Sequence, residues 1–390
     1  MTPIYLDYAA TTPVAPEVAE AMAQCLTLDG NFANPASRSH RYGWQAEEAV
    51  ETARGQIAEL IGADAREIVW TSGATESNNL ALKGVFESAG KDVGHLAVSA
   101  IEHKSVLDPA QWLAEQGHEL SLIAPDSSGR ITAQAVASVL RSNTRLVSVM
   151  LVNNELGTIN PIAEIAQLCR EHGCLLHVDA AQALGKMPVN VTELGADLLS
   201  LSAHKFYGPK GVGALYVRRS PALKLAAQIH GGGHERGMRS GTLATHQCVG
   251  FGVAADLARA ELERGSEQKN SPEQVAQLRD RLWAGIAGLP GVRVNGHPSA
   301  RACGHLSVTF GELDGELLLL SLRELALSTG SACTSASMAP SYVLKAIGLS
   351  DAEALATLRI SLGRYTTEHE VERTIAHINT VVGKLTAKVS

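Results

Sequence analysis

A lysine that follows a strand-like run is the residue in this sequence best suited to covalent chemistry. The apolar residues 198–202 lead into Ala-His204-Lys205, and a turn rich in glycine and proline comes next. Such a turn can direct the amine of Lys205 into a cleft. A free lysine titrates near ~10.4, so an amine that is nucleophilic at neutral pH needs its pKa lowered by about three units. Burial and neighbouring groups can supply that shift, and the amine can then form an imine with a carbonyl cofactor. An isolated lysine in a loop is more often a surface residue, so the neighbouring motifs must decide.

An aspartate ends another strand-like run 26 residues earlier. Residues 174–179 read Cys-Leu-Leu-His-Val-Asp, and a lone carboxylate at the end of a buried strand is costly unless a cation or a donor meets it. A protonated pyridine nitrogen would be such a partner for Asp179, and its charge makes a pyridoxal ring an electron sink. The alternative is an aspartate that caps the strand end and binds nothing.

A third segment is suited to a phosphate group. Thr71-Ser-Gly-Ala-Thr-Glu-Ser77 reads as the end of a strand, a turn of small residues and the start of a helix. The free N–H groups near Gly73 and Ala74 and the hydroxyl of Thr75 would suit a phosphate, with Ser202 and His204 as further donors. A helix cap without a ligand is the alternative. A lysine, a ring-nitrogen aspartate and a phosphate cup together fit one cofactor, pyridoxal 5′-phosphate.

An alternation of strands and helices would position these segments. Strand-like runs occur at 67–71, 95–99, 119–123, 145–151, 174–179, 198–202 and 213–217, and helical patterns at 76–87, 105–116, 132–141 and 162–172. Strands that are apolar on both faces and separated by helices predict an α/β domain with a mostly parallel sheet. Ligands of such sheets bind beyond the carboxyl ends of the strands, which is where the three segments lie.

The pattern changes after residue 260. A charged stretch is followed by a shorter set of elements, with helices near 273–287, 314–324, 341–347 and 368–385 and strands near 292–295, 305–310, 325–328 and 357–361. The sequence thus predicts a large domain over 15–260 and a smaller α+β domain made of 1–14 and 261–390.

Composition excludes several classes of protein. The 390 residues are 45% hydrophobic and carry a net charge of −7, which gives no general attraction to nucleic acid or to an anionic membrane. No run approaches the roughly 20 apolar residues that cross a bilayer. The N-terminus lacks a basic-then-apolar signal, so a cytoplasmic location is expected. Six cysteines without a CxxC pair are typical of reduced thiols.

Ten motifs spread over nearly the whole chain resemble those of the cysteine desulfurases of the IscS/NifS group. These are fold-type I enzymes of the class V aminotransferase family that use pyridoxal phosphate. The motifs are Tyr5-Leu-Asp-Tyr-Ala-Ala-Thr-Thr-Pro13, Asn34-Pro-Ala-Ser-Arg-Ser-His40, Thr71-Ser-Gly-Ala-Thr-Glu-Ser77, Glu102-His103-Lys104, Val152-Asn-Asn154-Glu155, His177-Val-Asp-Ala-Ala-Gln182, His204-Lys205, His230-Gly-Gly-Gly-His-Glu-Arg-Gly-Met-Arg-Ser-Gly-Thr242, Ser331-Ala-Cys333-Thr-Ser335 and Arg359-Ile-Ser-Leu-Gly-Arg364.

The resemblance implies how the cofactor is held. Lys205 would bind it covalently, Asp179 would pair with the pyridine nitrogen, and Gln182 would bond the phenolic oxygen. His103 would stack on the ring and move protons, for which its ordinary pKa of about 6.5 is suitable. The groups expected around the cofactor and its phosphate are Gly73, Ala74, Thr75, Asn154, Ser202, His204 and, from the other subunit of a homodimer, Thr242.

The resemblance also implies the substrate and the path of the sulfur. Asn34, Asn154 and Arg359 would bind L-cysteine, and the planar guanidinium of Arg359 matches a carboxylate. Cys333 lies in a loop of small residues that is expected to move easily. It would attack the substrate sulfur after Cα deprotonation, keep it as a persulfide and release alanine. A thiol with a pKa near 8.5 is only about 3% thiolate at pH 7, so Cys333 needs a lowered pKa or a proton acceptor.

Other readings stay open at this point. A selenocysteine lyase or an aminotransferase would use the same pocket without a persulfide, and a non-catalytic scaffold for iron–sulfur assembly would bind no cofactor. Cys169, His172, Cys174 and His177 have zinc-like spacing, but they span a helix end and a strand on which Cys174 and His177 face opposite sides, so no metal site is expected. Housekeeping members of the group generally have a further C-terminal tail that engages a scaffold protein, whereas this sequence ends at Ser390. The sulfur acceptor, for iron–sulfur clusters or tRNA thiolation, is therefore left open.

Overall fold

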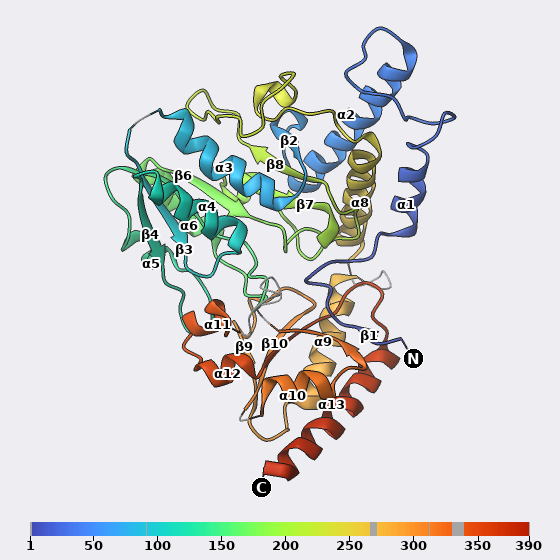
Figure 1. Cartoon of the computed structure of the whole chain (residues 1–390), viewed down its shortest axis with the longest axis vertical. Helices are drawn as coiled ribbons and strands as arrows, with labels where there is room; N and C mark the ends of the chain where they lie inside the picture. Colours follow the sequence, from blue (N-terminus) through green and yellow to red (C-terminus); the bar gives the residue numbers. More distant parts are fainter. Residues whose placement is uncertain (1, 91, 266–270, 312, 330–338, 390) are drawn as a thin grey trace.

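The computed structural model describes residues 2–90, 92–265, 271–311, 313–329 and 339–389. Figure 1 shows an upper part built on one large sheet and a lower part built on a smaller sheet with two long helices. The N-terminal segment crosses between the two parts before the chain enters the first helix of the upper part.

The large sheet has seven strands in the order β2-β8-β7-β6-β5-β3-β4. The ladders from β7 to β4 are parallel, and β8 alone runs antiparallel to both of its neighbours, β2 and β7. The mostly parallel sheet expected from the sequence is therefore confirmed. The strands are β2 Ile68–Thr71, β3 His95–Ser99, β4 Glu119–Ile123, β5 Thr144–Ser148, β6 Leu175–Asp179, β7 Leu198–Ser202 and β8 Gly213–Val217.

Helices cover both faces of this sheet because its strands carry apolar side chains on both faces. Val69 and Leu198 join one cluster with α3 and α4, whereas Trp70 and Leu199 join a second cluster with α2, α6 and α8. The helices of this part are α1 Pro16–Ala23, α2 Arg41–Ile61, α3 Ala74–Ser88, α4 Lys104–Glu115, α5 Ala133–Ala137, α6 Ile162–His172, α7 Val191–Leu194 and α8 Thr245–Arg264.

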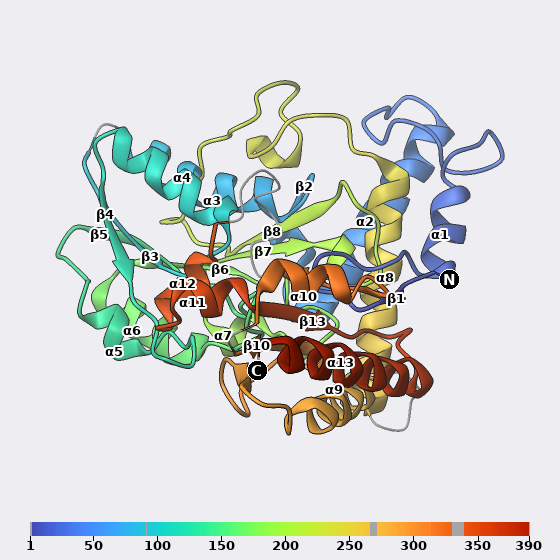
Figure 2. The same ribbon diagram turned by 60° about the horizontal axis from the view of Figure 1, so that its bottom comes forward.

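The smaller part contains a four-stranded antiparallel sheet in the order β12-β13-β10-β9, and a parallel pair of β1 with β11. The long helices α9 and α13 lie side by side, as Figure 2 shows. The elements are β1 Ile4–Tyr5, β9 Val292–Asn295, β10 His305–Phe310, β11 Leu325–Ala326, β12 Ser328–Thr329, β13 Thr357–Ser361, α9 Pro272–Ile286, α10 Gly315–Ser321, α11 Tyr342–Ala346, α12 Asp351–Leu355 and α13 Glu368–Val389.

The apolar clusters bear on the domain boundaries, which stay a prediction. Ile4 and Leu6 pack in one cluster with buried residues between 275 and 385, in keeping with an N-terminal strand that belongs to the smaller part. Val343 and Leu344 of α11 instead pack in the largest cluster of the upper part. We therefore propose 15–260 as the large domain, with α11 as its contact from the smaller one.

Several elements differ from the expected ones, and α7 and α12 are short helices that the sequence pattern did not predict. The strand near 325–328 is split, because β11 pairs with β1 and β12 pairs with β13 in another sheet. The helix expected at 132–141 is the short α5. The apolar pattern does not indicate α8, whose glycines allow close packing: a Cβ on Gly252 would lie 2.7 Å from the Cα of Ala53 in α2. Over the described residues, no helix is long and apolar enough to span a bilayer.

Candidate active site

A cavity of about 590 Å³ lies at the carboxyl ends of the parallel strands. It is formed by the ends of β6 and β7, the start of α3, the N-terminal segment and β13. The residues that line it are Ala10, Thr11, Ser72, Gly73, Ala74, Thr75, His103, Ser105, Met150, Val152, Asn154, Asp179, Ala181, Gln182, Ser202, His204, Lys205, Lys210, Gly211 and Arg359.

Lys205 sits in a 3₁₀ turn, Ala203–Lys205, directly after β7. Its Nζ lies 2.8 Å from the carbonyl oxygens of both Ala9 and Ala10 and donates to them. These two carbonyls come from the N-terminal segment that crosses below the sheet. Two carbonyl oxygens thus hold the amine inside the cavity. Because these oxygens carry no charge, the amine can leave them to bind a reaction partner.

Asp179 ends β6, the strand beside β7, and its side chain is buried with 6% exposure. Its Oδ1 accepts from the N–H of Ala181 at 2.9 Å, and its Oδ2 accepts from Asn78 Nδ2 at 2.9 Å. No cation forms an ion pair with Asp179 among the described residues. A buried carboxylate with two neutral donors has lone pairs left for a positively charged ring nitrogen.

A chain of neutral side chains connects Asp179 with His103. Asn78 Nδ2 also donates to Ser105 Oγ at 2.8 Å, and Ser105 Oγ lies 2.8 Å from His103 Nδ1. The backbone N–H of Ser105 donates to the same Nδ1 at 3.1 Å, so this nitrogen is the acceptor and the proton of neutral His103 lies on Nε2. The sequence reasoning missed Asn78 and Ser105. Their signal is weak, since each is a small polar residue in the first turn or two of a helix.

The part of the cavity that is expected to hold a phosphate is formed by a helix start. Gly73 is the N-cap of α3, and Gly73, Ala74 and Thr75 line the cavity with first-turn N–H groups that have no partner within a helix. His204 Nδ1 lies 3.1 Å from Thr11 Oγ1. Burial and then the nearby lysines, Lys205 first, lower the pKa of His204 to about 4, so its ring is neutral at pH 7 and can both donate and accept.

Arg359 and Asn154 also line the cavity and contact each other. Arg359 donates from Nη1 to the carbonyl of Asn154 at 3.0 Å and from Nη2 to Asp7 Oδ1 at 2.9 Å. The Nε of Arg359 and the Oδ1 of Asn154 are buried and have no hydrogen-bond partner among the described residues. Both side chains therefore have capacity left for a polar ligand.

Three predicted residues are not placed in this cavity. Asn34 lines a different cavity of about 460 Å³, together with Arg38, Arg54 and His234. Thr242 is exposed on the segment before α8 and does not line the cavity of its own chain. Cys333 lies outside the described residues, so its position relative to Lys205 stays a prediction.

The cysteines and histidines with zinc-like spacing have other partners. His177 bonds Ser148 Oγ at 2.8 Å and Ser200 Oγ at 2.9 Å, so both of its ring nitrogens are occupied. Cys174 Sγ lies 3.7 Å from the carbonyl of Cys169. Within the described ranges, no group of three or more His, Cys, Asp or Glu side chains is arranged to hold a metal ion.

Comparison with known proteins places the chain in a family. The family described as Aminotransferase class-V matches residues 4–374. The chain belongs to the class-V aminotransferase family. Its class-V relatives include the protein named cysteine desulfurase IscS from Shewanella woodyi, which is 56% identical over 383 residues, 98% of this chain and 93% of the relative. A protein of the same name from Acinetobacter baumannii is 55% identical over 384 residues, with the same coverage.

Solved structures of class-V relatives agree in fold. A protein described as NifS-like superimposes with a TM-score of 0.89 at 34% identity, over 98% of this chain and all of its own. A structure described as SspA in complex with cysteine has a TM-score of 0.81 at 42% identity, over 93% of this chain and all of its own.

Class-V enzymes of this kind use pyridoxal 5′-phosphate, and the site fits that cofactor. A buried carboxylate without an ion-pair partner, an amine held by carbonyls and a helix start lie around one cavity. A volume of about 590 Å³ is in the range of small-ligand pockets. The residues present therefore match the ring nitrogen, the aldehyde and the phosphate of the cofactor.

Proposed function

We propose that this chain is a cysteine desulfurase that converts L-cysteine to L-alanine and passes the sulfur to an acceptor. The observation that carries the proposal is the meeting of Lys205 and Asp179 in one cavity, at the ends of the adjoining strands β7 and β6. The relatives support it, because proteins named cysteine desulfurase are 55–56% identical over 98% of the chain.

Pyridoxal 5′-phosphate, when bound, supplies an aldehyde that joins to amines and a ring that accepts the electrons of a broken Cα–H bond. Lys205 is the residue proposed to join it. The carboxylate of Asp179 keeps the ring nitrogen protonated, and Asn78 and Ala181 hold that carboxylate in place. Gln182 offers an N–H to the ring oxygen. The phosphate is assigned to Gly73, Ala74, Thr75, Ser202 and His204.

His103 is proposed to move protons through Nε2, because Ser105 occupies Nδ1. The chain Asn78–Ser105 fixes the imidazole relative to Asp179, so the ring keeps its orientation while Nε2–H acts as the proton donor.

Arg359 and Asn154 are proposed to bind the substrate carboxylate, and the unused N–H donor at Arg359 Nε supports this. Asp7 holds the Arg359 guanidinium at 2.9 Å and so sets its orientation. Cys333 is proposed to attack the substrate sulfur. The new S–S bond leaves a persulfide on Cys333, and the C–S electron pair and a proton leave with alanine.

Borohydride reduction of the purified holoenzyme, followed by peptide mapping, tests the assignment of Lys205. We expect a pyridoxyl mass on the peptide that contains Lys205, and an unlabelled peptide would refute it. A Cys333→Ala variant tests sulfur transfer. Sulfide release from L-cysteine should vanish for a desulfurase, whereas a lyase or an aminotransferase that lacks the persulfide step would keep its activity.

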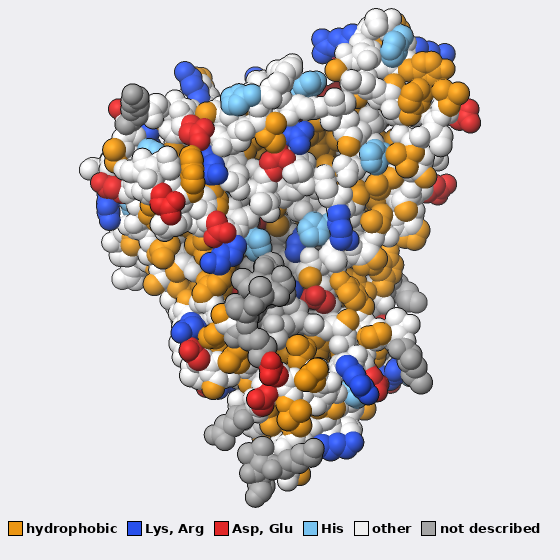
Figure 3. Space-filling model, viewed as in Figure 1, with side chains coloured by type: hydrophobic (Ala, Val, Ile, Leu, Met, Phe, Trp, Pro, Cys, Tyr) orange, Lys and Arg blue, Asp and Glu red, His pale blue; other side chains and the backbone are white. Residues whose placement is uncertain are grey.

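A homodimer is the proposed assembly, with Thr242 reaching the site of the partner subunit. Thr242 is exposed outside its own cavity, as such a contact requires. Large apolar side chains also gather on the upper right of Figure 3, over the segment between α1 and α2. The exposed large apolar residues of this segment are Leu26, Leu28 and Phe32, and Tyr42 and Trp44 follow in the first turn of α2. The acceptor protein, for iron–sulfur clusters or tRNA thiolation, and the cytoplasmic location stay predictions.

A further inference from the structure

The side-chain amide of Gln182 is held at both ends. Its Oε1 accepts from Lys186 Nζ at 2.6 Å, and its Nε2 donates to the carbonyl of Ala9 at 2.7 Å. An ammonium group only donates and a carbonyl only accepts, so these two partners decide which end of the amide is the oxygen. One N–H of Nε2 is left over, and Gln182 lines the active-site cavity.

The same carbonyl also holds the reactive lysine. Ala9 O accepts from Lys205 Nζ at 2.8 Å, and the N–H of Ala9 donates to Ser361 Oγ at 2.9 Å. Lys186, Gln182, Ala9 and Lys205 are thus joined in one chain of hydrogen bonds. Gln182 and Lys205 line the active-site cavity, whereas Lys186 and Ala9 do not.

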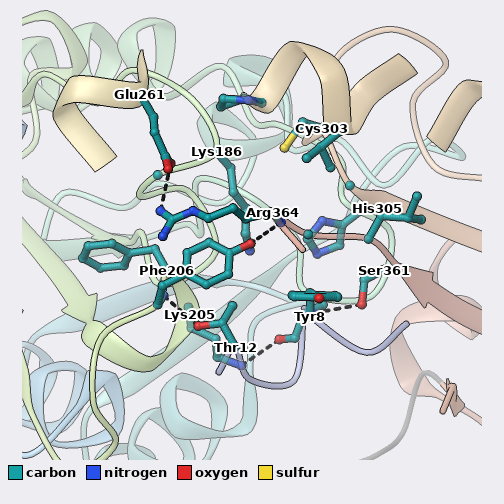
Figure 4. A pocket seen from close by; sticks show the side chains of 18 residues that line it. Tyr8, Thr12, Lys186, Lys205, Phe206, Glu261, Cys303, His305, Ser361 and Arg364 are labelled. Atoms are coloured by element: carbon teal, nitrogen blue, oxygen red, sulfur yellow. Dashed lines mark hydrogen bonds and ion pairs between the residues drawn. The ribbon is translucent and has the colours of Figure 1, made fainter. Parts of the chain in front are cut away.

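Lys186 instead lines a small second cavity of about 30 Å³, which it shares with Lys205, Cys303 and His305 (Figure 4). That volume holds one or two water molecules. The carboxylate in its wall, Glu261, is bonded to Arg364 at 2.8 Å. No carboxylate forms an ion pair with Lys186 among the described residues.

A partly buried ammonium group without a carboxylate is unfavourable for folding. Burial lowers the pKa of Lys186 to about 7, and Lys205 and Arg359 add repulsion. An apolar side chain of the same length would avoid both costs. An apolar side chain could not make the hydrogen bond to Gln182. This contact therefore indicates that Lys186 serves the reaction rather than folding.

We propose that Lys186 is a positioning residue of this active site, which holds the oxygen of Gln182 so that the remaining N–H is offered to the ring oxygen of the cofactor beside Lys205. The proposal rests on the proposed function. Without Lys186, the buried Oε1 would lose its donor, and the amide would turn or shift to recover one. The cofactor would then lose a donor next to the atom that joins Lys205.

Lys186→Met removes the donor and keeps the length of the side chain. We expect kcat for alanine formation to fall about tenfold, the worth of one hydrogen bond, with KM for L-cysteine within about twofold. The absorbance maximum of the bound cofactor should shift, and titration of the apo-protein with pyridoxal 5′-phosphate should show weaker binding. Lys186→Arg, which keeps a donor, should recover most of the loss. Lys224→Met, at an exposed lysine outside both cavities, is the matched control.

Thermal unfolding separates positioning from a structural role. The methionine variant should unfold at the same or a higher temperature than the unaltered chain, because it no longer buries an unpaired charge. A lower unfolding temperature with an unchanged spectrum and kcat would overturn the proposal. If methionine prevents folding, Lys186→Leu is the shorter apolar replacement, and failure of both variants to fold would assign a structural role and overturn the proposal too.

A double variant tests whether Lys186 acts through Gln182. The losses from Lys186→Met and Gln182→Leu should not multiply, and the double variant should be no worse than Gln182→Leu. Multiplying losses would refute the link. Measurements on the unaltered chain separate failure of the proposed function from failure of this inference. If the unaltered chain bound no pyridoxal phosphate and formed no alanine, the proposed function would fail. If the unaltered chain and Lys186→Met were equally active, only the present inference would be rejected.

Discussion

Asn78 is the residue on which the geometry of the proton-transfer groups depends. Its two N–H bonds point at Asp179 Oδ2 and Ser105 Oγ, and the hydroxyl of Ser105 in turn meets His103 Nδ1. The group that would hold the ring and the group that would move its protons are therefore positioned by one amide. This couples the orientation of His103 to that of Asp179 without a charge between them.

Asn78→Ala should weaken the binding of pyridoxal 5′-phosphate about tenfold or more, because a hydrogen bond to a charged group is worth about 1.5–3 kcal/mol. Absorbance titration of the apo-protein measures this. Asn79→Ala is the matched control, since Asn79 is half-buried and its Nδ2 bonds the carbonyl of Thr75 one turn earlier rather than Asp179. Equal affinities of the two variants would show that Asn78 does not support the site.

The residues proposed to act directly were easier to predict than those that hold them. Asp179, His103 and Lys205 stand at strand or helix ends within distinctive motifs, and the structure brings them to one cavity. Asn78 and Lys186 were missed, because each is important through a contact and not through its local pattern. Asn78 contacts a residue 101 positions along the chain, and Lys186 contacts one that is 4 positions away. Asn34 and Thr242 are not in that cavity, and a single chain does not test their roles.

At the scale of elements, His177 links three strands below the site. It sits in β6 two residues before Asp179, and its ring bonds Ser148 of β5 and Ser200 of β7. The strand that ends at Asp179 and the strand that leads to Lys205 are therefore joined by side chains as well as by the backbone ladder. Full burial lowers the pKa of His177 to about 4, so the ring is neutral in the folded chain.

The burial of neutral His177 makes the free energy of unfolding fall at acid pH. Below about pH 6.5 the unfolded chain takes up a proton at His177, whereas the folded chain does so only near pH 4, so the stability is lost as the pH falls through that window. Between pH 7 and pH 5 the unaltered apo-protein should lose about 2 kcal/mol more of its free energy of unfolding than His177→Gln does. Urea unfolding at the two pH values measures it. An equal loss in both proteins would mean that His177 is not protonated differently on unfolding.

The order of the strands shows what a sequence pattern can and cannot predict. The runs at 95–99, 119–123, 198–202 and 213–217 agree with β3, β4, β7 and β8, because buried strands are short and apolar. The antiparallel direction of β8 and its place between β2 and β7 depend on the path of the connections, which no local pattern records. The helix α8 was not predicted for a related reason. Its glycines allow close contacts with α1 and α2, and they do not form part of an apolar stripe.

At the scale of the whole molecule, the segment that carries Thr242 is fixed to the sheet. Glu235 accepts from Arg54 at 2.6 and 2.9 Å and from the N–H of Trp70 at 2.8 Å, all buried. Arg239 bonds Glu76 in the first turn of α3 at 2.8 Å. These contacts hold the segment that leads to Thr242 on the surface, and Arg239 ties it to the helix whose start faces the cavity. A contact with a second copy of the chain would use such a surface.

If each active site contains residues of both subunits, two inactive variants should regain activity when their chains form a mixed dimer. Lys205→Ala should abolish activity, and Thr242→Asp should weaken cofactor binding by placing a negative charge beside the phosphate. A mixed dimer would contain one site with both native residues and one site with neither. After dissociation and random reassociation, an equal mixture should therefore recover about a quarter of the native activity. Sedimentation should give a mass of twice 41.1 kDa for each homodimer.

The control for this complementation is a pair of variants within one chain's own cavity, Lys205→Ala and Asp179→Ala. Because both residues line the same cavity of one chain, their mixed dimer holds no intact site and should stay inactive. Recovery in the first mixture and not in the second would place Thr242 in the partner's site. Failure of both mixtures in samples shown to contain mixed dimers would mean that each chain carries a complete site, and Thr242 would lose its proposed role.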